Sequence, residues 1–355
     1  MARVLLITGA GASTALGAGK RVPLMAEFSD ALVAALNDVD QRLAPDAKLA
    51  VGLDGEIFER RLGDYLRAVD MLPLLSRYPD IGLNPVVTDK PSRTQLHNYV
   101  SNWFGVARNR SDAFGRVLNS VLYREFGDKR RNAELARSVY GELLKLIGWG
   151  QANVSLTVAT TNYDLFCEVT LKDLGVGVDD GVVETSHRTF ELAPWEIVPF
   201  SPGRVSVLHL HGAVGWYRTD SSVVEVDPGG RDFDDRRQPA LLYPDIEKNP
   251  WDESGWGANV IWEKFEKAAS EATHIVFLGH SLHDEPILRV VRGALENGPT
   301  VLIGVYEHAS SEETEEVKRK SESIDPPYGG AELIPVEYGV EGGLDLLGDY
   351  INSSA

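Results

Sequence analysis

The feature that most constrains the fold is an apolar strand that runs directly into a glycine-rich turn near the amino terminus. Residues 4–8 are aliphatic or β-branched, which is typical of a parallel strand buried on both faces, and a helical pattern begins near Pro23. In doubly wound folds such a turn holds a diphosphate, because glycines let the backbone approach and free N–H groups attract the anion. The sequence therefore predicts an α/β fold with a Rossmann-like parallel sheet and helices on both faces. The residues of the turn are Gly9, Ala10, Gly11, Ala12 and Ser13.

The turn by itself does not fix the ligand. The third glycine of the dinucleotide fingerprint is replaced by Thr14, and no acid follows cleanly after a second strand about 20 residues on. A phosphate-loop NTPase is excluded, because Gly19-Lys20 is followed by Arg21 where Ser or Thr is needed. An ordinary tight strand-to-helix turn remains the alternative interpretation.

Length and composition narrow the class of protein. The 355 residues suggest two compact units or one large α/β unit with an insertion. The chain has a single cysteine, Cys167, which excludes intrachain disulfides and any zinc site of two or more thiolates. Such low cysteine use is typical of cytoplasmic proteins. We expect Cys167 to be a buried core thiol. Without an apolar run of about 18 residues or a secretion signal, we expect no membrane span. A net charge of −18 argues against direct nucleic-acid binding.

The chain is predicted to consist of one domain with an insertion. From about residue 46 to 149 apolar residues recur mostly at helical spacing, for example in Glu56–Leu66 and Ala133–Leu146. Strand patterns begin again after residue 150. We therefore predict a Rossmann-like domain built from residues 1–45 and 150–355, with an inserted helical module at 46–149.

Polar residues follow the second predicted strand, Val154–Thr160. Thr161, Asn162 and Asp164 stand at its carboxyl end, where ligands bind in sheets of this kind. Helix capping is the alternative role for Asn162 and Asp164, since both residue types cap well. One cap is enough for one helix, however, so this cluster exceeds the structural need.

A third strand is predicted over Val205–Gly212. His209 and His211 are two residues apart and are therefore expected on the same side of it. An imidazole at the carboxyl end, as His211 would be, suits a general base near neutral pH. A His-x-His metal pair is the alternative, but no further cluster of ligands supports it, so we expect no metal.

The fourth predicted strand, His274–Leu278, ends in Gly279-His-Ser-Leu-His-Asp284. Gly279 and Ser281 at a strand-to-helix turn form a second candidate anion site. The helix that begins at Glu285 would be capped by Asp284 or Ser281.

The fifth predicted strand, Thr300–Tyr306, is followed by Glu307. A carboxylate at this place accepts hydrogen bonds from ribose hydroxyls in dinucleotide-binding folds. A surface acid without a ligand is the equally weighted alternative.

The four strand ends together, in their order and identity, resemble the sirtuin-like family (the silent information regulator superfamily). The resemblance covers residues 1 to about 30 and 150–310. It implies that NAD is bound with its diphosphate at the first turn. It further implies that Asn162 supports the nicotinamide ribose or an attacking water, that Asp164 lies in the nicotinamide pocket, and that His211 is the catalytic base.

The same resemblance assigns the remaining strand ends to the cofactor. Gly279 and Ser281 would contact it near a phosphate or ribose, and Glu307 would approach the adenosine ribose. Thr161 stands where deacetylating sirtuins usually carry Gln and would lie in the same site. The chain also departs from those deacetylases after the His-Gly motif, where it has no cysteine for their four-cysteine zinc module.

These departures make the chain similar to the bacterial antiphage branch, whose sirtuin-like domains hydrolyse NAD. The resemblance implies an NAD+ glycohydrolase that releases nicotinamide and ADP-ribose, a homo-oligomer, and a separate activator such as a HerA-like ATPase or an Argonaute-like protein. Three alternatives stay open: a protein ADP-ribosyltransferase, a deacylase, and a non-catalytic NAD-sensing or scaffold subunit.

Overall fold

The computed structural model describes residues 2–9, most of 140–306 and 332–336, together with single helical residues between 31 and 124 and at 315 and 319. Several sequence predictions lie outside the described residues. These are the turn residues Ala10, Gly11, Ala12 and Ser13, the residues Ser281 and Glu307, and most of the helical module at 46–149.

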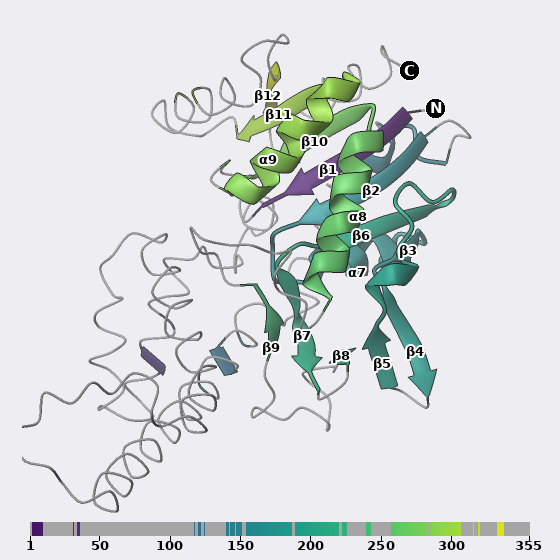
Figure 1. The fold of residues 1–355 in the computed structure, drawn as a ribbon, viewed down its shortest axis with the longest axis vertical. Coiled ribbons are helices and arrows are strands. Elements are labelled where there is room, and N and C mark those ends of the chain that lie inside the picture. The colour runs from purple at the N-terminus through teal and green to yellow at the C-terminus, as the bar shows by residue number, and fades with distance from the viewer. Residues whose placement is uncertain are drawn as a thin grey trace, which may run out of the picture.

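The core of the fold is a seven-stranded sheet in the order β12-β11-β10-β1-β2-β6-β3 (Figure 1). Every pair of neighbouring strands in it is parallel. The predicted strands at 154–160, 274–278 and 300–306 are confirmed at both ends. The strands are β1 (Ala2–Thr8), β2 (Val154–Thr160), β3 (Gly177–Asp179), β6 (Arg204–His209), β10 (His274–Leu278), β11 (Thr300–Tyr306) and β12 (Glu332–Val336).

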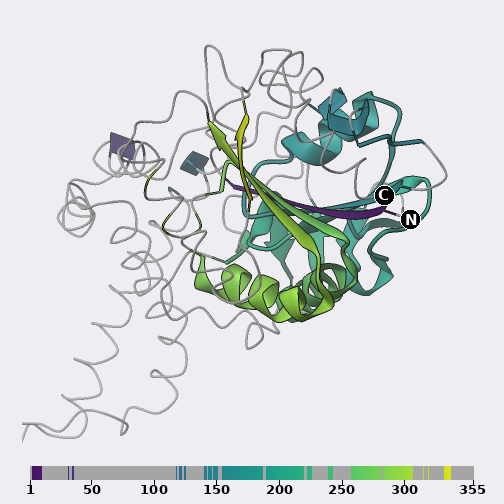
Figure 2. The same ribbon diagram turned by 90° about the horizontal axis from the view of Figure 1, so that it is seen from above.

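Helices cover both faces of this sheet, as Figure 2 shows with the sheet seen along its edge. On one face lie α8 (Ala258–Glu271) and α9 (Glu285–Ala294). On the other lies α7 (Phe166–Asp173), together with the described helical residues between 140 and 145. The predicted fold class, a Rossmann-like α/β sheet between helices, is confirmed.

Successive side chains of a strand point to opposite faces of the sheet, which explains why helices must cover both faces. In β1, Leu5 and Ile7 pack with α8 and α9, whereas Val4 and Leu6 pack on the side of α7. All four are at most 2% exposed. Burial of one such side chain contributes about 1.5–3 kcal/mol, so an uncovered face would forfeit a large part of the stability. This is why the strand reads as continuously apolar.

A second sheet of five antiparallel strands, in the order β4-β5-β8-β7-β9, lies beyond the parallel one (Figure 1). Sequence analysis did not predict a second sheet, because four of its five strands are only three to five residues long. Two short 3-10 helices, η1 (Pro194–Glu196) and η3 (Leu295–Asn297), complete the described elements. The strands are β4 (Val182–Ser186), β5 (Thr189–Leu192), β7 (Gly212–Arg218), β8 (Val223–Glu225) and β9 (Pro239–Leu241).

The prediction of one strand over 205–212 is wrong at its carboxyl end. β6 ends at His209, a turn occupies residues 210–211, and β7 begins at Gly212 in the other sheet. Gly212 has φ +79°, and a Cβ there would collide with the carbonyl oxygen of Ala240. The chain therefore changes sheets at a residue where glycine alone fits.

The order of the strands locates the crevice where ligands bind in such sheets. From β1 the chain builds β2, β3 and β6 on one side of it, and later β10, β11 and β12 on the other. The strand order therefore reverses between β1 and β10. In open parallel sheets, ligands bind outside the carboxyl ends of the strands at this switch point.

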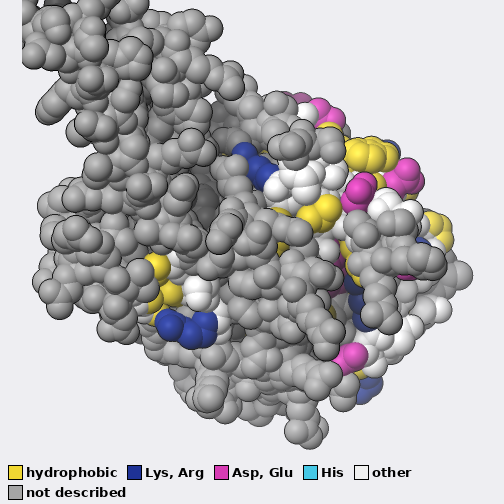
Figure 3. Space-filling view, turned by 90° about the horizontal axis from the view of Figure 1, so that it is seen from below, with side chains coloured by type: hydrophobic (Ala, Val, Ile, Leu, Met, Phe, Trp, Pro, Cys, Tyr) yellow, Lys and Arg dark blue, Asp and Glu magenta, His cyan; other side chains and the backbone are white. Residues whose placement is uncertain are grey.

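The surface visible in Figure 3 mixes hydrophobic, basic and acidic side chains among the described residues. The exposed large hydrophobic residues include Trp195 and Val198, which lie in and just after η1. Within the described part of the chain, no helix is both long and apolar enough to cross a membrane.

Candidate functional site

The two glycines that flank the switch point are in close backbone contact. Gly9 follows β1 and Gly279 follows β10, and the Gly9 amide donates to the carbonyl of Leu278 at 3.1 Å. A Cβ on Gly9 would lie 2.7 Å from the Gly279 oxygen and 2.9 Å from Cα of His280. Both obstacles are backbone atoms, so a larger residue would push the turns apart. Glycine is needed at position 9 because the backbone of Gly279 and His280 lies this close to it.

Asn162 joins the end of β2 to the same turn. Its Nδ2 donates to the carbonyl oxygen of Gly9 at 3.0 Å, and its backbone amide donates to the Thr160 hydroxyl at 3.1 Å. Thr161 adds a second link, because its amide donates to the Thr8 carbonyl at 3.1 Å. Asn162 therefore does not cap α7, and its carboxamide is fixed at the switch point.

Asp164 bonds the start of α7 in the manner of a cap, although it stands one residue before the N-cap position, Leu165. Its Oδ1 accepts from the amide of Phe166, the first residue of α7, at 3.1 Å. The residue is buried, with 4% of its surface exposed. One carboxylate oxygen thus satisfies an otherwise orphaned amide of the helix start. The capping role is therefore present beside any role toward a ligand.

His211 is held in the turn between β6 and β7 from several sides. Leu210 donates its amide to the Thr160 carbonyl at 2.9 Å, and its carbonyl accepts from the Trp262 indole at 2.9 Å. The His211 carbonyl accepts from the amide of Leu242 at 2.8 Å. Trp262 is fully buried, so the turn is anchored to the core through α8.

The side chain of His211 contacts a carboxylate from the opposite half of the sheet. Its Nε2 lies 2.8 Å from Oδ2 of Asp284, which immediately precedes α9. Asp284 occupies the predicted cap position but makes no capping hydrogen bond through its side chain. The prediction that it could cap α9 is therefore not confirmed. Sequence reasoning named this aspartate as a helix cap and did not assign it to the site, although it ends the Gly279–Asp284 motif.

His209 and His211 do not act as a pair. His209 Nε2 lies 3.1 Å from Oε1 of Glu168 in α7, and its ring packs edge-on to Trp216 with centroids 5.3 Å apart. The expectation that both imidazoles face the same way failed because β6 ends at His209. In the described part of the chain, no group of three His, Cys, Asp or Glu side chains is placed to hold a metal.

Burial and the neighbouring charge shift the pKa of His209 in opposite directions. Burial tends to lower its pKa, but the Glu168 carboxylate and its hydrogen bond outweigh burial, so the pKa of His209 lies above its usual 6.5. Cys167, beside Glu168, is buried, and burial raises the pKa of its thiol well above the usual value. The thiol stays protonated, which agrees with the prediction of a core residue and not a nucleophile.

The structure thus brings six of the predicted site residues to one edge of the parallel sheet. Hydrogen bonds and backbone contact connect the ends of β1, β2, β6 and β10. The other six, in the first turn and after β10 and β11, lie outside the described residues. Those brought together are Gly9, Thr161, Asn162, Asp164, His211 and Gly279.

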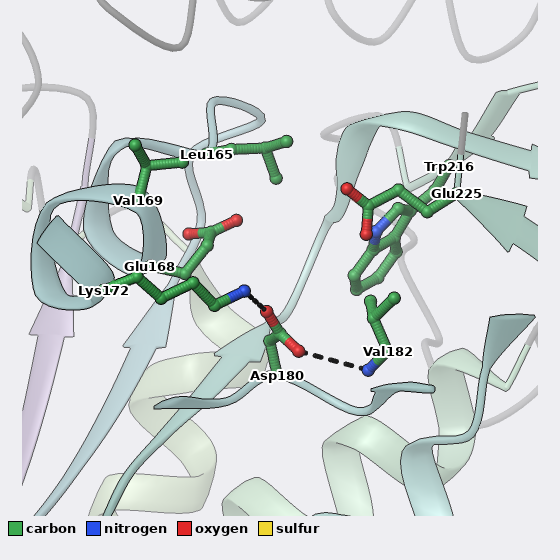
Figure 4. Close-up of a pocket in the computed structure, with 8 residues that line it drawn as sticks. All are labelled: Leu165, Glu168, Val169, Lys172, Asp180, Val182, Trp216 and Glu225. Atoms are coloured by element: carbon green, nitrogen blue, oxygen red, sulfur yellow. Dashed lines mark hydrogen bonds and ion pairs between the residues drawn. The ribbon is translucent and has the colours of Figure 1, made fainter. Parts of the chain in front are cut away.

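A separate small pocket lies between α7 and the antiparallel sheet (Figure 4). In it Lys172 Nζ lies 2.6 Å from Oδ2 of Asp180, whose Oδ1 accepts from the amide of Val182 at 3.2 Å. No predicted site residue lines this pocket, so it is distinct from the strand-end crevice. Its lining consists of Leu165, Glu168, Val169, Lys172, Asp180, Val182, Trp216 and Glu225.

Residues 156–326 match the family model described as SIR2-like domain. The matched segment begins within β2 and contains the strand ends of β2, β6 and β10. The sirtuin-like resemblance of the sequence is therefore supported over this part of the chain. No curated protein matches the chain.

Solved structures similar to this chain include three Sir2 complexes. They are a Sir2 homologue mutant with 2′-O-acetyl ADP-ribose (13% identity, TM-score 0.38), Sir2Tm with a propionylated peptide (13%, 0.37), and Sir2 with a p53 peptide and NAD+ (13%, 0.38). Each alignment covers 99% of this chain and 92% of the other.

Proposed function

We propose that this chain, whose residues 156–326 match a SIR2-like domain, cleaves the nicotinamide–ribose bond of NAD+ to give nicotinamide and ADP-ribose. The observation that carries the proposal is the convergence of Gly9, Asn162 and His211 at the carboxyl ends of β1, β2 and β6. A close-packed glycine, a fixed carboxamide and an imidazole then stand at the switch point of the sheet. These are the groups that binding a dinucleotide and activating water require.

We infer that the first turn binds the diphosphate of NAD+, and the packing around Gly9 supports this inference. Gly9 leaves no room for a Cβ, because it lies directly against the backbone of Gly279 and His280 after β10. We infer that backbone amides of the residues after Gly9 bind the diphosphate, since amides at such strand-to-helix turns bind anions well. Gly279 and Ser281 would complete the site from the β10 side, and Glu307 from the end of β11.

The chemistry assigned to the side chains is hydrolysis. Asn162 orients a water molecule or the ribose 2′-hydroxyl, and His211 takes up the proton that the water loses. The water oxygen bonds to C1′ of the ribose as the C1′–N bond breaks, and the electron pair of that bond leaves on neutral nicotinamide. Asp164 holds the carboxamide of the leaving nicotinamide.

Hydrolysis is favoured over deacylation by the cysteine count. The chain has one cysteine, Cys167, which is buried in α7 and followed by none. A four-cysteine zinc module of the deacetylase type cannot be built from it. We therefore infer that the ribosyl group is transferred to water and not to an acylated peptide.

We further propose that the chain is the NAD-depleting effector of an antiphage system and works in the cytoplasm as a homo-oligomer. Its support is the sequence resemblance alone, which also implies a separate activator such as a HerA-like ATPase or an Argonaute-like protein. Infected cells that carry the system should lose NAD, and cells that carry His211→Ala should keep it.

The decisive experiment measures nicotinamide released from NAD+ by the purified chain, alone and after concentration into any oligomer. His211→Ala should lower the rate by about 10²–10⁴-fold, because a positioned general base contributes that much. Asn162→Ala should do the same. Mass spectrometry separates free ADP-ribose, which hydrolysis gives, from ADP-ribose on protein, which a transferase gives.

His274→Ala is the matched control. It removes an imidazole at the amino end of β10, the opposite edge of the sheet from the crevice. Thermal unfolding identifies variants that have lost the fold. Full NAD cleavage by folded His211→Ala and Asn162→Ala would refute the assignment, whereas loss in both with activity kept in His274→Ala would support it.

A further inference from the structure

We propose that Asp284 is a positioning residue that keeps the His211 imidazole in the tautomer with its proton on Nε2, so that Nδ1 is the atom that accepts a proton. The role of Nδ1 in catalysis rests on the proposed function. The arrangement of the two side chains does not, because it is visible in the structure independently of any reaction.

The geometry carries the first step. Oδ2 of Asp284 lies 2.8 Å from Nε2 of His211, within the range of charge-assisted hydrogen bonds. The two residues are separated by 73 positions and belong to opposite halves of the sheet. Their side chains are 14% and 6% exposed, so water competes little for the contact.

The chemistry of the two groups carries the second step. An ionised carboxylate accepts hydrogen bonds and does not donate them, so the imidazole nitrogen beside it must carry the proton. In the neutral ring the lone pair then resides on Nδ1. A proton taken up at Nδ1 gives an imidazolium that the nearby carboxylate stabilises.

The position of Asp284 argues that the contact is specific. Aspartate before a helix ordinarily accepts from the first helical amides, yet this side chain makes no such bond to α9. Its backbone is extended, with φ −80° and ψ 92°, as expected of a cap residue. The carboxylate thus forgoes a stabilising cap and contacts His211 instead.

The direct test is nitrogen-15 NMR of the full chain with labelled histidine, with the His211 signals assigned by their loss in His211→Ala. The expected result for the wild type is the pattern of an Nε2-protonated neutral ring. Asp284→Asn presents an amide whose Nδ2 donates, and it should shift the signals toward the Nδ1-protonated form. A wild-type ring protonated on Nδ1, or signals unchanged in Asp284→Asn, would overturn the proposal.

A second, kinetic experiment compares Asp284→Asn with a control substitution at the neighbouring residue, Glu285. Asp284→Asn should lower kcat for NAD+ cleavage by about 10²–10⁴-fold with little change in KM, because orientation of the base and not binding is lost. Glu285→Gln removes the same charge one residue later, from an exposed side chain that pairs with Arg292, and should leave kcat unchanged. Equal kcat in the wild type and Asp284→Asn would overturn the proposal. Failure of the wild type to cleave NAD+ would instead refute the proposed function, and the NMR result would then decide the tautomer of His211.

Discussion

Glu168 and His209 form a buried pair that links α7 to the end of β6. Oε1 of the carboxylate lies 3.1 Å from Nε2 of the imidazole, and their side chains are 6% and 0% exposed. Removing one partner of such a pair costs roughly 3–5 kcal/mol, because the other is left buried without compensation. His209 directly precedes the turn at residues 210–211 that carries His211, so the pair anchors that turn to α7.

This pair makes the stability of the protein depend on pH. The pKa of His209 is raised in the folded state above its usual 6.5, against burial and through Glu168. Its contribution is therefore complete below the unfolded-state pKa and is lost as the pH rises through the folded-state pKa. Urea unfolding at pH values from below to above these two pKa values should show that the free energy of unfolding falls as the pH rises. This fall should be smaller in Glu168→Gln. An identical pH dependence in the variant would contradict this account.

Gly9→Ala should destabilise the protein and impair the crevice. The new Cβ would meet backbone atoms of Gly279 and His280 at 2.7 and 2.9 Å, and the turns would have to separate. Overpacking of this kind costs about 1–3 kcal/mol. Thermal unfolding measures the loss, and calorimetry with NAD+ should show weaker binding.

Gly293→Ala is the control for that substitution. Gly293 lies in α9, and a Cβ there meets no described atom within 4 Å. Because alanine favours the helix by up to about 1 kcal/mol over glycine, this variant should be as stable as the wild type or more so. A similar loss of stability in both variants would show that close approach is not what requires Gly9.

Two substitutions at Asp164 separate its structural role from a role toward NAD+. Asp164→Asn keeps an oxygen that can accept from the Phe166 amide, whereas Asp164→Ala removes it. We expect Asp164→Ala to lower the free energy of unfolding by about 0.5–2 kcal/mol, as for other lost caps, and Asp164→Asn to change it less. If the carboxylate also holds nicotinamide, kcat/KM for NAD+ should fall in both.

The comparison of Asp164→Asn with the wild type decides between the two roles. Full NAD+ cleavage together with unchanged unfolding would leave capping as the only role of Asp164. Reduced cleavage with unchanged unfolding would assign it to the reaction.

The sequence alone determined the parallel strands and their polar ends. β2, β10 and β11 were predicted at both ends, because a strand buried on both faces is mostly aliphatic or β-branched and is followed by polar residues or glycine. The same local pattern identified Gly9, Asn162 and His211 as candidates, since their positions relative to strand ends are visible in one dimension.

Only the tertiary structure decided which of these groups touch. Asp284 reaches His211 across 73 positions and Glu168 reaches His209 across 41, and neither contact follows from local spacing. The turn at residues 210–211 moved the two histidines to different partners, because the chain changes sheets at Gly212. Periodicity records which side of an element is buried; the partner of each buried polar group depends on how the strands are ordered in space.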